Sequence, residues 1–462
     1  MNCIIKIGVV SLIAGVACVS ADDTITKSLS SLDSAAQGNN EDTVMVKERT
    51  EKLEQGGLIH DKGPGRFEIV KKLPEKADSF DEMFDYADAY GKLKLAFIDS
   101  AHKISATTDK KEKIATAAGG EVGINTAEFY GFGLHLTTYI SQSVGFLNPS
   151  KDEINEDFFN IKKNSFAYIA ESSLNYNSEL INAKLGRVKV ETPYANSDDI
   201  RMAANTFEGA WASINYSSEL QTQVLFVNKW AGYDSQDDIT QSQDKFKNLV
   251  NENSFGMVAI SLDYKYDKDG ELSFWYNYID EMSAIAYSEM AGIYFLSGDG
   301  FHIDYGFQAS NIQDLRSSGV AGNVFGTMLL LHYNGVYFGG AYNIALVENG
   351  NYVTNGFGGG PYYTSLDEAT IAAISEVSQQ DSEAFRFATG YDFANVGLDG
   401  MTFEIVYGEG YSSDVFRVKE KDLILTYEMS DKLYFEAIYA NHASSDNMND
   451  FDRIFVRAAY SF

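Results

Sequence analysis

The chain ends in Arg453-Ile454-Phe455-Val456-Arg457-Ala458-Ala459-Tyr460-Ser461-Phe462, a stretch in which two kinds of residue alternate. One set is apolar or small: Ile454, Val456, Ala458 and Tyr460. The set between them is mixed and contains Arg453 and Arg457. Successive side chains of a β-strand point to opposite faces, so this stretch predicts a strand whose faces meet different surroundings. It suits a membrane barrel, with the apolar face in lipid and the other face towards a wet lumen.

The first residues indicate export. Lys6 is followed by a mostly apolar run over residues 7–19, and small residues then lead to Asp22. This pattern is typical of a secretory signal peptide, and the run is too short for a spanning helix with flanks. We therefore predict a signal peptide over residues 1–21. Because Cys3 and Cys18 both lie within it, the mature chain would hold no disulfide and no thiolate metal site.

The composition excludes several classes of protein. The chain has 66 Asp and Glu against 36 Lys and Arg, and its formal net charge is −30. No binding of nucleic acid is expected, because phosphates need a basic surface. After the signal peptide no apolar run reaches the roughly 18 residues of a spanning helix, which excludes a helical membrane protein. The 29 Tyr and 30 Phe, with only 5 Pro, favour many strands.

The chain divides near residue 90. Residues 22–90 are charged and alternate little, and we interpret them as a polar N-terminal extension, periplasmic or flexible. Short helices are expected within residues 44–53 and 79–90. Residues 91–462 are predicted to form an all-β, transmembrane antiparallel β-barrel. At about ten residues per strand, with short and long loops alternating, they fit about 16 to 18 strands, and we prefer 18.

Alternating segments recur through this region. Those expected to be strands are residues 92–97, 130–140, 166–176, 180–190, 210–216, 221–230, 255–266, 271–279, 301–309, 326–333, 336–345, 384–393, 401–407, 422–427, 433–440 and 453–462. At least two more strands are expected, near residues 119–126 and between residues 280 and 300. Longer polar stretches such as 234–253 and 349–383 are interpreted as extracellular loops.

No catalytic or metal constellation stands out. The 6 His are scattered without a metal-binding spacing between any two, so no metal, cofactor or enzyme activity is predicted. His135, His302 and His332 could serve a barrel phospholipase, but nothing marks one of them or a serine partner. The glycine-rich run at residues 356–361 is not expected to cradle phosphate, since no strand leads directly into it.

Several cations are expected to face the lumen. In residues 385–393 the aromatic side chains stand at odd-numbered positions and so share one face of the strand. Arg386 has the other parity and lies on the opposite face. Because an arginine in lipid costs about 2–4 kcal/mol at the midplane, parity places Arg386 in the lumen. The same argument places there Lys92, Lys94, Arg453 and Arg457. These cations could guide anions or carboxylates, or each could pair with a neighbouring lumenal acid, and both interpretations stay open.

The middle of the chain carries an ordered set of motifs. Residues 184–209 contain, in order, Gly186-Arg187, Thr192-Pro193, Asn196-Ser197-Asp198-Asp199, Arg201 and Asn205-Thr206-Phe207-Glu208. This order resembles the constriction-loop region of the OprD family of substrate-specific outer-membrane porins. Shorter resemblances lie at residues 117–132, 228–234, 355–364 and 391–403. The closing aromatics Tyr460 and Phe462 resemble the membrane-insertion signal of outer-membrane barrels.

The resemblance implies an 18-stranded barrel whose third loop folds inward and narrows the pore. It also implies a basic ladder for carboxylates, with Arg201 placed at the constriction by motif. Parity alone adds Arg386, Arg453, Arg457 and Lys94. Asp198 and Asp199 would be opposing acids or a structural turn, with the turn preferred. Ala203-Ala204 stands where the family usually has Leu-Pro, so a less rigid loop and a wider eyelet are expected.

The leading hypothesis is a passive porin for small hydrophilic solutes, such as amino acids, peptides or carboxylates, in the bacterial outer membrane. The alternative is a structural or adhesive surface barrel with a plugged lumen. The expected partners are outer-membrane lipid and lipopolysaccharide, the barrel assembly machinery through the C-terminal strand, and small solutes. A monomer and a homotrimer both stay open.

Overall fold

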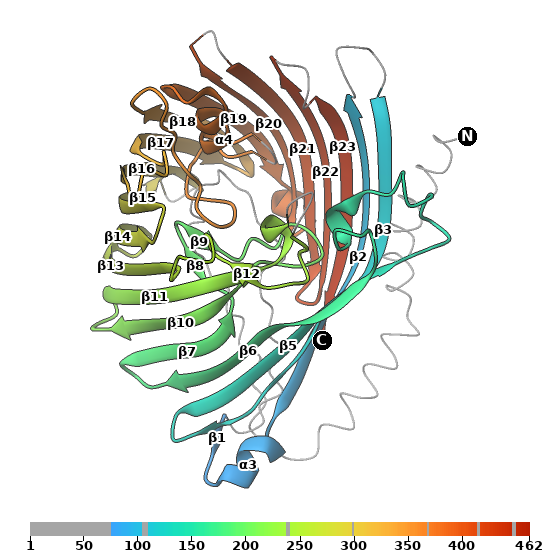
Figure 1. Cartoon of the computed structure of the whole chain (residues 1–462), viewed down its shortest axis with the longest axis vertical. Coiled ribbons are helices and arrows are strands. Elements are labelled where there is room, and N and C mark those ends of the chain that lie inside the picture. Colours follow the sequence, from blue (N-terminus) through green and yellow to red (C-terminus); the bar gives the residue numbers. More distant parts are fainter. Residues whose placement is uncertain are drawn as a thin grey trace.

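The structure is a computed structural model and describes residues 75–103, 110–236, 241–297, 300–366, 369–413, 416–445 and 450–462. Its described residues form a closed antiparallel barrel of 18 strands (Figure 1). Each barrel strand pairs with its neighbour along the chain, and the last strand closes the ring by pairing with the first. The predicted fold and strand number are confirmed.

The barrel strands are β2 (Asp88–Lys103), β3 (Lys110–Asn125), β5 (Phe132–Ser143), β6 (Phe166–Asn177), β7 (Ile181–Val188), β10 (Thr206–Asn215), β11 (Leu220–Ala231), β13 (Met257–Asp267), β14 (Gly270–Ile279), β15 (Ser283–Ser297), β16 (Phe301–Asp314), β17 (Gly322–Tyr333), β18 (Val336–Leu346), β19 (Ser382–Asp392), β20 (Met401–Ser412), β21 (Phe416–Ser430), β22 (Leu433–Ser444) and β23 (Phe451–Ser461). Short strands are β1 (Lys76–Ala77), β4 (Glu128–Phe129), β8 (Glu191–Thr192), β9 (Ala195–Asn196) and β12 (Lys247–Asn248). The helices are α3 (Phe80–Asp85) and α4 (Ile371–Ser378), with 3-10 turns η1 (Glu156–Phe158), η2 (Tyr233–Ser235) and η3 (Phe393–Val396). The two strands expected without firm boundaries are β3 and β15.

The alternation of β23 is as the sequence predicts. Arg453 and Arg457 point inward and are buried, whereas Ile454 points outward and is 38% exposed. In β19 Arg386 points inward between the outward Phe385 and Phe387. Large apolar side chains stay exposed around the outer wall: Leu93, Val122, Leu134, Ile169, Leu185, Phe226, Ile260, Phe274, Met290, Phe307, Phe325, Phe338, Phe387, Ile405, Leu423, Tyr439 and Ile454. A band of this extent suits contact with lipid rather than water.

The two ends of the barrel differ in their connections. One end has short turns, such as residues 268–269 and 334–335, and the other carries the long segments 144–165, 189–205, 232–256 and 347–381. In outer-membrane barrels the short turns are periplasmic. The strand β2 begins at Asp88, slightly before the expected boundary at residue 91.

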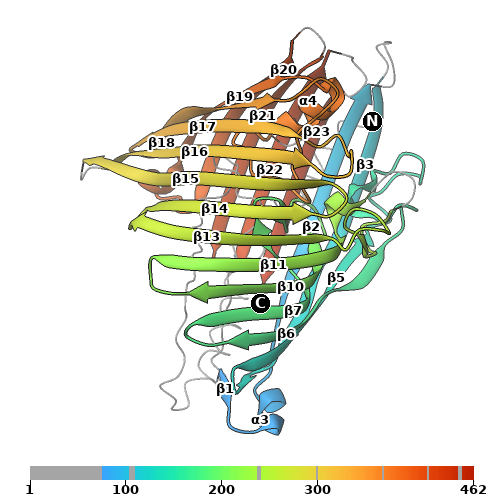
Figure 2. The ribbon, with the colours of Figure 1, turned by 60° about the vertical axis from the view of Figure 1, so that its left-hand side comes forward.

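A short stretch ahead of β2 is packed at the short-turn end (Figures 1 and 2). Helix α3 begins after Ser79, whose hydroxyl accepts a hydrogen bond from the Glu82 amide and so caps the helix. Its Met83 is buried with Ala77 and Ala127. This is the helix expected within residues 79–90, while the one expected within residues 44–53 lies outside the described residues. Within the described ranges, no helix is both long and apolar enough to cross a membrane.

Candidate constriction site

The loop between β7 and β10 folds into the ring of strands, where β8 and β9 are drawn in Figure 1. Its tip is a tight hairpin, because the Thr192 hydroxyl donates to the Ala195 carbonyl at 2.9 Å and accepts from the Ala195 amide at 3.1 Å. The Asn196 side chain then accepts a hydrogen bond from the Asp198 amide at 2.8 Å. Asp198 has a φ of +25°, so it is a turn residue. The inward-folded constriction loop is therefore confirmed.

A second loop meets this hairpin inside the barrel. It connects β18 to β19, and its Phe357 forms a parallel bridge with Ala195. The Asn196 amide donates to the Phe357 carbonyl at 2.9 Å, and the Phe357 amide donates to the Tyr194 carbonyl at 3.0 Å. Residues 349–383 were expected to form an extracellular loop, and for this part of them the expectation was wrong. The two loops together make a band, which we call the loop bridge.

Glycine makes the loop bridge possible. Gly356 has a φ of +75°, and a Cβ placed there would lie 2.3 Å from the Tyr194 carbonyl oxygen. Gly358 has a φ of +113°, and its Cβ would lie 2.5 Å from the Asn196 carbonyl oxygen. Both positions need a left-handed backbone and a close backbone approach, which only glycine meets without strain. The glycine-rich run that the sequence left without a role therefore packs against the hairpin.

Tyrosines attach the loop bridge to the wall formed by β15 and β16. The Tyr194 hydroxyl hydrogen-bonds Ser310 at 2.7 Å and Tyr362 at 3.2 Å. The Tyr363 hydroxyl donates to Glu289 at 2.7 Å. Burial raises the pKa of Tyr194 to about 12, so its hydroxyl stays protonated at neutral pH. The sequence did not indicate these tyrosines, since nothing distinguishes them from the many tyrosines of the barrel wall.

The opposite end of the hairpin segment docks on β2 and β23 through Asp199. Its carboxylate lies 3.5 Å from Lys92 and 3.7 Å from Arg457, and it also pairs with Lys94. Burial alone would raise the pKa of Asp199, but the three cations hold that pKa well below its usual range. Asp199 is therefore an acid that opposes the cations, not only part of a turn. Asp199 thus differs in role from its neighbour Asp198, which is a turn residue.

The cations of this wall also hold the loop backbone. Arg457 donates to the carbonyls of Asp199 at 2.8 Å and of Arg201 at 3.0 Å. Lys94 donates to the Arg201 carbonyl at 3.3 Å. A further ion pair of 3.0 Å joins Arg457 to Glu436 on β22. Lys94, Asp199, Arg201 and Arg457, which the sequence assigned separately, therefore form one cluster.

The side chains of the other ladder arginines, Arg201 included, are also buried in pairs or stacks. Arg201 is 2% exposed, lies 3.4 Å from Asp157 and stacks on Phe455. Arg386 is separate from this cluster, and its partner is Glu404 at 3.3 Å. Arg453 stacks on the ring of Phe451, with 4.9 Å from its guanidinium carbon to the ring centre. The contacts of Arg201 and Arg386 support the interpretation in which a lumenal cation pairs with a neighbouring acid.

A second charged group lies beside the Asp199 cluster. Lys189, at the start of the inward loop, lies 3.1 Å from Glu121 and 3.5 Å from Glu171. Glu121 is directly opposite Lys92 in the register of β2 and β3. The sequence did not indicate these two acids: β3 begins with several charged residues, and in β6 a register shift places Glu171 inward although Ile169 points outward.

Ala203-Ala204, expected from the resemblance to make the loop less rigid, is held by packing. Ala203 and Ala204 are buried against Tyr139, Phe166 and Ala170. Small side chains fit this space, and the packing fixes the return of the loop to β10. The expected lower rigidity of the loop and wider eyelet stay predictions.

A closed barrel with an apolar outer wall and long loops folded into a charged lumen defines an outer-membrane channel. A family model described as "outer membrane porin, OprD family" matches residues 170–462, more than half of the chain. The chain belongs to the OprD family. It is an outer-membrane porin, as the sequence predicted, and the family and fold indicate a channel rather than an enzyme.

Solved structures share the fold. OccK9 (OpdG) of Pseudomonas aeruginosa is 13% identical, with a TM-score of 0.67 over 82% of this chain and 99% of that one. OpdK of the same organism, solved with vanillate, is 13% identical with a TM-score of 0.68 over 82% and 99%. OccAB4 of Acinetobacter baumannii is 14% identical with a TM-score of 0.65 over 81% and 98%. No curated protein sequence shows a significant match.

Proposed function

We propose that this porin conducts small zwitterionic solutes, namely amino acids or short peptides, past a constriction that presents both charges. The observation that carries this is the adjacency of two mixed clusters. One places Lys92, Lys94 and Arg457 around Asp199, and the other places Lys189 between Glu121 and Glu171.

The side chains of these two clusters that water can reach include both positively and negatively charged groups. Side-chain exposure is 9% for Lys92, 15% for Lys189, 11% for Glu121 and 17% for Asp199. A solute with a carboxylate and an ammonium group can pair with one cation and one acid at the same time. A simple anion meets the acids as like charges, which costs it part of that attraction. The fully buried arginines act in this proposal as supports of the loop.

Removing the negative charge of Asp199 tests whether the constriction presents both charges to the solute. In Asp199→Asn the three cations lose the acid that they share, so we expect the reversal potential in a salt gradient to shift towards anion selectivity. We expect Lys92→Gln to shift it the opposite way. In liposome swelling, wild-type protein should admit alanine faster than lactate, and Asp199→Asn should narrow that difference.

The matched control is Asp399→Asn, which removes the same charge from an exposed turn between β19 and β20. It should leave both the reversal potential and the swelling rates unchanged. Equal swelling rates for alanine and lactate in wild-type protein would reject the zwitterion assignment, while leaving the channel itself intact.

We also propose that Phe462, with Tyr460, is the part of the closing strand that the assembly machinery recognises. The support is geometric: Phe462 exchanges backbone hydrogen bonds of 3.0 and 2.9 Å with Gly91, yet its ring is 48% exposed. The ring of Tyr460 stacks on it with centres 6.5 Å apart. Phe462→Ala should reduce the amount of folded barrel in the outer membrane of expressing cells. Leu398→Ala, in an exposed turn, is the control, and equal amounts for both variants would contradict the proposal.

A further inference from the structure

Two histidines that lie far apart in the sequence meet at the periplasmic end of the lumen. The register of β16 and β17 places His302 directly opposite His332. The sequence did not predict that these two histidines lie close together, because their spacing was considered along the chain and not across paired strands.

Both histidines face the lumen. In β16 the inward parity is shown by Gln308, whose side chain donates to the Pro361 carbonyl of the inward loop. His302 and Asp304 share that parity. In β17 the inward residue Leu330 packs with Tyr363 of the same loop, and His332 has the parity of Leu330.

The three side chains converge. His332 Nε2 lies 3.0 Å from Asp304 Oδ2, and His302 Nε2 lies 3.9 Å from Asp304 Oδ1. One nitrogen or oxygen atom from each residue lies within 4.8 Å of the others. The imidazole rings stack, with centres 4.3 Å apart and planes 10° apart. Among the described residues, Asp304 Oδ1 is buried and accepts no hydrogen bond.

We propose that His302, Asp304 and His332 bind a divalent transition-metal ion of the Zn²⁺ class at the periplasmic mouth of the channel. Metal–ligand bonds of about 2.0–2.2 Å in tetrahedral geometry separate two ligand atoms by about 3.3 Å. The nitrogen–oxygen separations of 3.0 and 3.9 Å lie on either side of that value. Two imidazoles and one carboxylate favour such an ion over Ca²⁺ or Mg²⁺, which prefer oxygen ligands.

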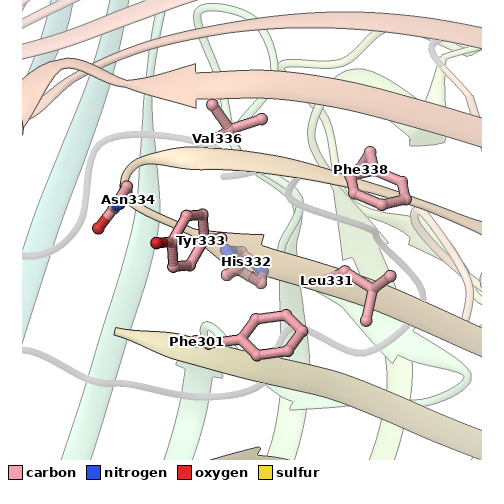
Figure 3. Close-up of a pocket in the computed structure, with 7 residues that line it drawn as sticks. All are labelled: Phe301, Leu331, His332, Tyr333, Asn334, Val336 and Phe338. Atoms are coloured by element: carbon pink, nitrogen blue, oxygen red, sulfur yellow. The ribbon is translucent and has the colours of Figure 1, made fainter. Parts of the chain in front are cut away.

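Aromatic rings flank both imidazoles, and the strand faces set the route of entry. The ring of Phe295 lies 5.5 Å from His302, and the ring of Tyr337 lies 5.5 Å from His332. The pocket in Figure 3 lies at the same end of these strands and is lined by Leu331, Tyr333 and Val336 together with His332. Leu331 and Tyr333 flank His332 with the opposite parity, so they point to the outer wall. The ion therefore reaches the site from the lumen, where side-chain exposure is 27% for His302 and 20% for His332.

Zinc titration of the refolded protein, without a histidine tag, tests the site. We expect calorimetry with ZnCl₂ to show one bound ion per chain, and His302→Gln, Asp304→Asn and His332→Gln each to weaken binding by about tenfold or more. His102→Gln, on the opposite side of the lumen at the long-loop end of β2, should bind as wild type. Paramagnetic resonance of the Cu²⁺-loaded protein should show coupling to two imidazole nitrogens.

The two measurements decide the proposal together. Unchanged zinc affinity in His332→Gln, or equal loss in the His102→Gln control, would overturn it. A Cu²⁺ spectrum without nitrogen coupling in wild-type protein would do the same. The readout is binding and not conductance, so failure here leaves the channel function untouched.

Discussion

Replacing Arg386 by Met is expected to lower the free energy of unfolding of the barrel by about 3–5 kcal/mol. The guanidinium lies 3.3 Å from Glu404, and the two side chains are 1% and 2% exposed. Arg386 also donates to the Ser365 carbonyl of the inward loop at 3.3 Å. Removing the cation leaves the Glu404 carboxylate buried without its partner, which is the costly case. Urea titration in lipid vesicles, followed by tryptophan fluorescence, measures the loss.

Two further variants distinguish the contribution of the ion pair to stability from that of side-chain packing. The double variant Arg386→Met with Glu404→Leu should recover most of the lost stability, because no isolated charge remains. Arg316→Met is the control, since Arg316 is 72% exposed beside Glu281, and it should change the stability by less than about 1 kcal/mol. A double variant as unstable as Arg386→Met would show that the ion pair is not the cause.

The wall of the barrel was predictable from the sequence because lipid and lumen impose a period of two. That period placed Arg386 and Arg457 on the inner face and Ile454 on the outer face, as the structure shows. Boundaries were less accurate: β21 begins at Phe416, well before the expected residue 422, since its early part is rich in charge. This end of the strand extends beyond the lipid, so it carries charged residues. A charged sequence of this kind is hard to distinguish from a loop.

Partners inside the lumen could not be predicted in the same way. Parity gives the face of a side chain but not the residue that it meets, which depends on strand register, ring closure and the paths of the loops. The contact of Asp199 with Arg457, and the facing of His302 and His332, both depend on such pairing. The meeting of Phe357 with Ala195 joins two loops whose paths no local pattern defines.

Breaking the loop bridge is expected to give the largest change in conductance. In Gly356→Val the new Cβ would overlap the Tyr194 carbonyl oxygen, which lies 2.3 Å from its position. The hairpin and the second loop must then separate, and the band across the lumen opens. We expect single-channel current to rise several-fold and to become noisier, because the loops lose their mutual hydrogen bonds.

Gly350→Val is the matched control for this change. Gly350 lies in the same loop with a φ of +92°, but a Cβ there meets no atom within 4 Å. The two variants therefore share the backbone strain of a left-handed position, and only Gly356→Val adds the clash. If both variants raise the current equally, strain in the loop is the cause and the loop bridge is not.

Single-channel recording of the refolded wild-type protein in planar bilayers tests most directly that this barrel is a channel narrowed by the loop bridge. We expect discrete current steps in wild-type protein, of smaller size than those of Gly356→Val under the same salt and voltage. A folded wild-type barrel that inserts yet passes no discrete current, or steps of equal size in the two proteins, would contradict that claim.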